Sequence, residues 1–66
     1  MIFLNGEPRE RAGATISELL VELGVEARAR GVAVAVDGEV DPRAEWDARR
    51  INEGERVEAR SAMQGG

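Results

Sequence analysis

Residues 15–24 of this 66-residue chain have the pattern of an amphipathic helix with both of its ends marked. Thr15 and Glu18 have the spacing of a capping box, in which each side chain accepts a hydrogen bond from the other residue's backbone N–H. Four apolar residues lie three or four positions apart and form one stripe: Ile16, Leu19, Leu20 and Leu23. Gly24 then stands where a helix typically ends in a left-handed residue. A single helix of this kind covers one face of a sheet.

A strand pattern precedes the helix. The apolar start of the chain runs into Asn5-Gly6, the favoured pair for a two-residue hairpin turn, because both turn positions need φ > 0. Residues 7–11 therefore form a second, more polar strand. Pro8 cannot donate to a ladder, so this strand lies at an edge of the sheet or is bulged.

A second hairpin pattern follows the helix. Residues 32–36 alternate Val and Ala, so the Val side chains enter the core while Ala33 and Ala35 lie on the far face. Asp37-Gly38 is another hairpin signal, and the return strand begins directly after it.

The remaining patterns are weaker. Residues 43–46 indicate one turn of α- or 3₁₀-helix, residues 49–51 a short strand, and residues 55–61 a last strand. The order hairpin, helix, hairpin, turn, strand predicts an α+β chain with a β-grasp, ubiquitin-like fold: a mixed four- to five-stranded sheet with one main helix. We expect one monomeric domain over residues 1–62 and a flexible diglycine tail over residues 63–66.

The expected core is thin, as in any domain of this size. Its residues share apolar side chains at inward positions: Ile2, Leu4, Ile16, Leu19, Leu20, Leu23, Val32, Val34, Val36, Ile51 and Val57. Trp46, the only Trp, is expected to be a lid on this core, with a binding hot spot as the alternative.

The composition excludes most enzyme chemistry. The chain has no Cys, His or Tyr, and all nine basic residues are Arg. It therefore lacks thiol nucleophiles, the usual zinc ligands, the common general base near neutral pH, and a Schiff-base amine, so we expect no metal site and no enzyme activity. A net charge of −4 argues against nucleic-acid partners and a polybasic membrane anchor. No apolar run approaches a membrane span, so we expect a cytoplasmic protein.

The sequence ends in Gly65-Gly66. Without Cβ atoms, such an end can pass as an extended strand through a channel too narrow for other side chains. It then presents an α-carboxylate that is ionised at neutral pH, because the pKa of this group is about 3.5. A carboxylate is a poor electrophile until a partner attaches a leaving group such as AMP. The alternative is a frayed end without function.

The segments described so far, together with the length and the terminus, are similar to one family over essentially the whole chain. They are, in order, Asn5-Gly6-Glu7-Pro8-Arg9, Thr15 to Gly24, Val32 to Val40, Pro42-Arg43, Trp46, Gly54 and Gln64-Gly65-Gly66. In this order they resemble the ThiS family, the sulfur carriers of thiazole (thiamine) biosynthesis. Two features depart from the family's usual pattern: Asp41 replaces an aliphatic residue, and Ala59 and Ser61 make the last strand less hydrophobic.

The resemblance implies a carrier acted on by partner enzymes. The Gly66 carboxylate would be adenylated with ATP by a ThiF-like enzyme of the ubiquitin-activating type. Sulfur from a persulfide donor would displace AMP and leave a thiocarboxylate, and a ThiG-like thiazole synthase would take up that sulfur. The carrier would bind no cofactor, because the activating partner consumes the ATP. Met63, Gln64 and Gly65 would form the threaded segment.

A docking face for these partners is expected on the sheet. The two-residue period of the first strand directs Phe3 away from the core, to the same face as Ala33 and Ala35. We interpret this face as a flat partner surface, with a singly exposed Phe3 covered by Arg side chains as the alternative.

Several charged residues allow two interpretations. Arg49-Arg50 is a partner contact or solvated charge, and Glu53, Glu55 and Glu58 steer the carrier to a basic surface or keep it soluble.

Two other functions stay open. One is a different ubiquitin-like sulfur carrier or modifier, such as a molybdopterin synthase small subunit or a tRNA-thiolation carrier. The other is an interaction module with an inert tail. Adenylation by a cognate activating enzyme separates carrier from module, and copurification with thiazole synthase separates the carriers.

Overall fold

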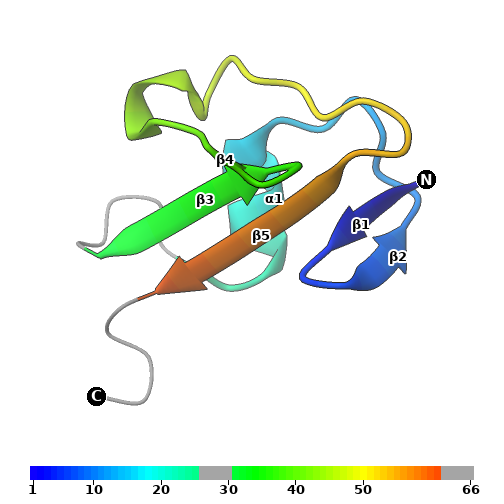
Figure 1. Cartoon of the computed structure of the whole chain (residues 1–66), viewed down its shortest axis with the longest axis horizontal. Helices are drawn as coiled ribbons and strands as arrows, with labels where there is room; N and C mark the ends of the chain where they lie inside the picture. The colour runs from blue at the N-terminus through cyan, green and yellow to red at the C-terminus, as the bar shows by residue number, and fades with distance from the viewer. Residues whose placement is uncertain (26–30, 62–66) are drawn as a thin grey trace.

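The first and last strands lie side by side in the computed structural model, which describes residues 1–25 and 31–61 (Figure 1). The elements in chain order are β1 (Ile2–Leu4), β2 (Glu7–Arg9), α1 (Ile16–Glu22), β3 (Val32–Val36), β4 (Glu39–Val40), the 3₁₀-helix η1 (Arg43–Glu45) and β5 (Arg56–Ser61). The strands form a sheet in the order β2-β1-β5-β3-β4, in which β1 and β5 are parallel and all other neighbours antiparallel. Helix α1 lies behind this sheet in Figure 1. The predicted β-grasp arrangement is confirmed.

Both predicted hairpin turns are present. Asn5 and Asp37 each have a φ of 50°, and Gly6 and Gly38, which follow them, have φ values of 83° and 85°. Positive φ at both central positions defines the turn type whose twist matches that of the flanking strands. Strand β2 is an edge strand, so Pro8 lies where a missing N–H costs the ladder nothing.

Helix α1 begins and ends as predicted. The Thr15 hydroxyl accepts from the Glu18 N–H at 3.1 Å, and the Glu18 carboxylate accepts from the Thr15 N–H at 2.8 Å. At the other end Gly24 has a φ of 75°, and the N–H groups of Gly24 and Val25 donate to carbonyls of the last turn at 3.0 and 2.9 Å. These bonds satisfy backbone groups that every helix end leaves without intrahelical partners. No helix in the described part of the chain is long and apolar enough to cross a membrane.

The segment between β4 and β5 differs from the prediction at one place. The turn predicted over residues 43–46 is confirmed as η1, but the strand predicted over residues 49–51 is wrong: this segment makes a single bridge, between Thr15 and Arg50. It pairs with the loop before α1, where the Ile51 N–H donates to the Ala14 carbonyl at 2.9 Å, and so does not join the sheet. The last strand begins at residue 56 because the Glu55 N–H still belongs to the preceding turn.

The core lies between α1 and the inner face of the sheet. Every predicted core residue is buried except Leu23 and Val32, which are partly buried because they lie at the ends of their elements. Ala14, Trp46 and Ala59 are also buried, although the sequence did not place Ala14 or Ala59 in the core. Trp46 is 3% exposed and its Nε1–H donates to the Asp41 carbonyl at 2.9 Å, so its role as a lid on the core is confirmed.

Candidate functional site

The residues predicted to carry the chemistry, Gly66 and the segment Met63, Gln64 and Gly65, lie outside the described residues, as does the predicted domain boundary after residue 62. The described chain leads up to them through β5, which ends at Ser61. Strand β5 is the middle strand of the sheet, with β1 on one side and β3 on the other. The chain therefore enters its last residues from a strand that pairs with β1 at its start and with β3 up to its last residue.

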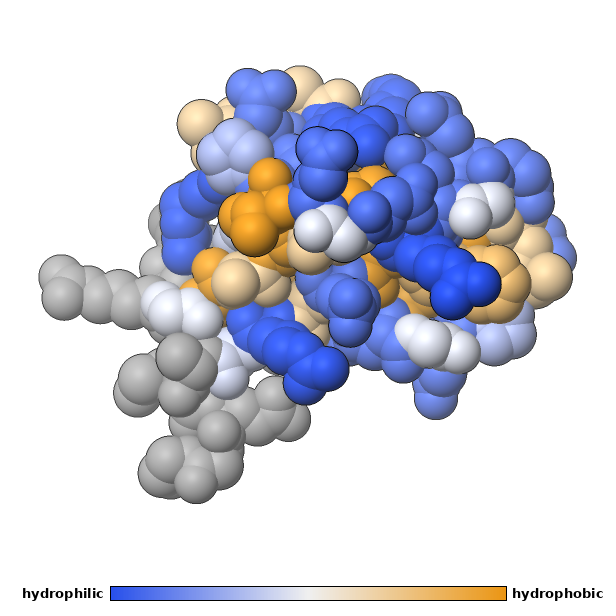
Figure 2. Space-filling view, in the orientation of Figure 1, coloured by the Kyte–Doolittle hydropathy of each residue, from blue (hydrophilic) through white to orange (hydrophobic). Residues whose placement is uncertain are grey.

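The predicted partner residues lie on the open face of the sheet, opposite α1, but they are not contiguous. Ala33 is exposed, whereas Ala35 and Phe3 are half-buried. Strand β5 separates β1 from β3, and the β5 residues that lie between the two groups are charged: Arg56, Glu58 and Arg60. The flat apolar surface expected from the sequence is thus divided by a charged row. Figure 2, which views this face, shows hydrophobic and hydrophilic residues interleaved.

Phe3 is covered by the charged row. The Arg56 guanidinium carbon lies 5.4 Å from the centroid of the Phe3 ring, within the range of a cation–π contact. This matches the alternative arrangement, in which Arg side chains cover the ring. Farther along the row, Glu58 and Arg60 form an exposed ion pair at 3.9 Å, a contact that contributes little to stability.

Val40 is an open-face residue that the sequence analysis missed. It is 78% exposed and, with Ala33 and Ala35, lines a shallow hollow of about 160 Å³ against Glu58 and Arg60. The sequence contains the information needed to place Val40 on this face. A two-residue turn at positions 37 and 38 pairs residue 40 with Ala35, and paired residues on neighbouring strands lie on the same face of a sheet. The main apolar part of the open face is therefore the β3–β4 side.

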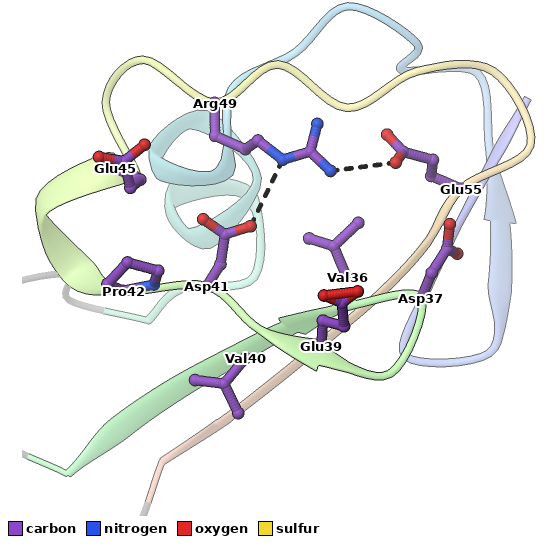
Figure 3. Close-up of a pocket in the computed structure, with 9 residues that line it drawn as sticks. All are labelled: Val36, Asp37, Glu39, Val40, Asp41, Pro42, Glu45, Arg49 and Glu55. Atoms are coloured by element: carbon purple, nitrogen blue, oxygen red, sulfur yellow. Dashed lines mark hydrogen bonds and ion pairs between the residues drawn. The ribbon is translucent and has the colours of Figure 1, made fainter.

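A second hollow, of about 410 Å³, is strongly acidic (Figure 3). Its residues come from the β3–β4 hairpin, the segment around η1 and the start of β5: Val36, Asp37, Glu39, Val40, Asp41, Pro42, Glu45, Arg49 and Glu55. Arg49 lies between two of the carboxylates, 3.4 Å from Asp41 and 3.0 Å from Glu55. The hydrogen bond to Glu55 is the main reason that the pKa of Arg49 is raised. Asp41, which departs from the family pattern, thus has a cationic partner.

The other charged residues that the sequence singled out have mostly structural contacts. Arg50 donates to the Gly13 carbonyl at 2.8 Å, and Glu53 pairs with the amino group of Met1. Glu55 is bound to Arg49. Of the three glutamates that were predicted to steer the carrier, Glu58 is the one that lies on the open face of the sheet, opposite Ala35. Charge steering by the acidic residues remains a prediction.

Comparisons with known proteins point to one family. The model of the ThiS family matches residues 2–66. The chain is 44% identical to the sulfur carrier protein ThiS of Thermus thermophilus over 66 residues, which is the full length of both chains.

Two solved structures from Geobacter metallireducens have the same fold. The crystal structure of its thiamine biosynthesis protein ThiS superposes with a TM-score of 0.73 at 35% identity, covering 98% of this chain and 97% of that one. A solution structure of a thiamine biosynthesis protein from the same organism gives a TM-score of 0.71 at 37% identity, covering 98% and 86%. A family match over nearly every residue, a full-length relative and this shared fold agree: the chain belongs to the ThiS family.

Proposed function

We propose that the chain is a sulfur carrier that delivers sulfur for the thiazole ring of thiamine as a thiocarboxylate on Gly66. The observation that carries the proposal is the family match, which extends through the terminal diglycine to residue 66. The full-length relative is named as a sulfur carrier, and both structural neighbours are thiamine biosynthesis proteins.

The proposed chemistry takes place in partner enzymes. A ubiquitin-activating type of enzyme, ThiF-like, joins the Gly66 carboxylate to AMP from ATP, with release of pyrophosphate. Sulfur from a persulfide donor then attacks the acyl carbon, AMP leaves and an acyl persulfide forms. A thiol cleaves its S–S bond, so that the thiocarboxylate is released and the donor sulfur and the thiol are oxidised to a disulfide. A ThiG-like thiazole synthase receives the sulfur from the resulting thiocarboxylate. The chain itself supplies a backbone carboxylate, which is consistent with a sequence that has no Cys, His or Lys.

The fold is consistent with a carrier that presents its C-terminal residues to the active sites of other proteins. The segment that ends at Gly66 continues from β5, whose backbone is paired to β3 from Val36–Val57 to Val32–Ser61. A rigid strand that leads into side-chain-free glycines suits an end that must enter an active site on another protein. Met63, Gln64 and Gly65 would form the threaded segment that leads to Gly66.

The open face is the proposed docking surface for the same partners. We assign to it Phe3, Ala33 and Ala35 together with Val40, with the charged row of β5 between them. A mixture of apolar and charged residues is ordinary for a transient interface, which as a whole is about as apolar as the rest of a protein surface. The charged row of β5 would set the orientation of the partner, because complementary charges on two proteins align them at their interface.

One experiment tests the proposed function. The full chain is incubated with ATP, the activating enzyme from the same source, a persulfide donor and a thiol reductant, and its intact mass is measured. Replacement of one oxygen by sulfur is the expected result, and it requires all four components. Transfer of that sulfur to a thiazole synthase, but not to a molybdopterin or tRNA acceptor, identifies the pathway. A chain whose mass never changes would be an inert module.

A further inference from the structure

A side chain continues the pairing of β5 where β1 leaves the sheet. The Phe3 N–H donates to the Glu55 carbonyl at 3.0 Å, and the Asn5 N–H donates to the Val57 carbonyl at 2.8 Å. If β1 continued, its backbone would next pair with Ala59. Instead the chain turns at Asn5, and the Asn5 amide occupies that place: its Oδ1 accepts from the Ala59 N–H at 2.9 Å and its Nδ2 donates to the Ala59 carbonyl at 3.3 Å.

This contact lies on the β1 side of β5, beyond the last residue pair of the two strands. The pairing of β1 with β5 covers Phe3–Arg56 and Leu4–Val57. Beside the contact is an open hollow of about 480 Å³, lined by Asn5, Gly6, Glu58, Ala59 and Arg60. In this part of β5, β3 holds one edge and the Asn5 amide grips the other.

We propose that Asn5 is a positioning residue, which fixes the direction in which β5 delivers the C-terminal residues to the activating enzyme. This inference rests on the proposed function. A strand held at one edge can rotate about that edge, and any deviation at Ala59 is carried to the residues beyond it. With the Asn5 amide on the other edge, the free carrier already holds β5 in the orientation that the partner needs. Binding then requires less ordering, so a smaller carrier concentration saturates the enzyme.

This position requires a backbone with positive φ and a side chain that can both donate and accept a hydrogen bond, and asparagine meets both requirements. Its backbone tolerates the φ of 50°. Its side chain also carries one donor and one acceptor in the same plane, as a backbone peptide does. Aspartate keeps the acceptor but places a second oxygen against the Ala59 carbonyl. Glycine keeps the turn, because Gly-Gly also forms this hairpin, but it removes the amide.

The test uses Asn5→Gly and Asn5→Asp in the full chain. The first readout is hydrogen exchange of the Ala59 amide by NMR, which needs no partner. The second is the steady-state KM and kcat of the activating enzyme for the carrier, measured as pyrophosphate release. Ile51→Val is the control for a small general loss of stability, because Ile51 is a buried core residue that takes no part in the bonds between Asn5 and Ala59. Asn52→Asp is the control for an added charge.

For Asn5→Gly, we expect Ala59 exchange to be at least about ten-fold faster and KM to rise roughly ten-fold, with kcat within about two-fold. Asn5→Asp should fall between Asn5→Gly and the wild type, and both controls should match the wild type in KM. Normal processing of the wild type with an unchanged KM for Asn5→Gly overturns this inference alone. An equal rise of KM in Ile51→Val overturns it too, since stability would then explain the effect. A wild-type chain that is never adenylated overturns the proposed function instead.

Discussion

The Arg49 guanidinium donates to the Glu55 carboxylate at 3.0 Å and so joins the loop after η1 to the start of β5. The same guanidinium lies 3.4 Å from Asp41, at the end of β4. The Asp41 and Glu55 side chains are only 14% and 18% exposed, so each would be a poorly solvated charge without Arg49. One arginine thus forms ion pairs with two carboxylates that come from separate parts of the sequence.

Replacing this arginine should destabilise the domain. For Arg49→Met we expect a loss of about 2 kcal/mol in the free energy of unfolding, because two partly buried carboxylates lose their partner. Urea denaturation followed by circular dichroism measures the change. The matched control is Arg60→Met, whose ion pair with Glu58 is exposed, and its effect should stay within about 0.5 kcal/mol. Equal losses in the two variants would contradict the structural role of Arg49.

The capping box predicts a pH dependence of stability. The Thr15 N–H donates to the Glu18 carboxylate and lowers its pKa in the folded state. A carboxyl whose pKa is lower in the folded than in the unfolded chain stabilises the fold fully above the unfolded value of about 4.3. That contribution is lost as the pH falls through the lower, folded value.

Glu18→Gln isolates this effect, because glutamine can accept the same hydrogen bond without titrating. Between neutral pH and about pH 3, its free energy of unfolding should fall less than that of the wild type. Glu10→Gln, at an exposed position, controls for the removal of a charge. The prediction is wrong if Glu18→Gln and Glu10→Gln have the same pH profile.

Extending the tail by one residue should stop its chemistry without changing the fold. A residue added after Gly66 moves the terminal carboxylate by about 3.5 Å. The carboxylate then lies outside the position at which the activating enzyme would join it to AMP. We expect no thiocarboxylate by intact mass and an unchanged thermal unfolding curve. Oxygen-to-sulfur exchange at the normal rate in the extended protein would refute the role of Gly66.

The docking proposal is tested by two exposed valines on different elements. Val40, on the open face, is 78% exposed, and Val21, on α1, is 75% exposed. Val40→Asp should raise the KM of the activating enzyme for the carrier about ten-fold, a typical effect for one well-placed interface residue. Val21→Asp should leave KM unchanged. Phe3→Asp gives a second test on the β1 side, and adenylation at the normal rate in both open-face variants would exclude this surface.

Local signals in the sequence predicted the elements well. The capping box at Thr15 closes within four residues, and the turn pairs at Asn5 and Asp37 are specified by the positive φ that both central positions of such a turn require. Their structures therefore depend little on the rest of the chain, and a single sequence contains what is needed to predict them.

Contacts between distant segments were harder to predict. The burial of Ala14 and Ala59 depends on which strands become neighbours, and the Arg49 contacts join the loop after η1 to β4 and β5. The expected apolar face was divided for the same reason: the sequence indicates that Phe3 and Ala33 share a face, but not that β5 lies between their strands.

The place of β5 in the sheet also matters while the protein is being made. In the sheet of the described residues, β5 lies between the β1–β2 and β3–β4 hairpins, and it is translated after the other four strands. In a nascent or prematurely terminated chain that lacks β5, no strand joins the two hairpins in a sheet, and the core lacks Val57 and Ala59. Such fragments should be cleared by cellular proteases, so that the chains that persist are those translated through β5, the strand that leads to the C-terminal residues.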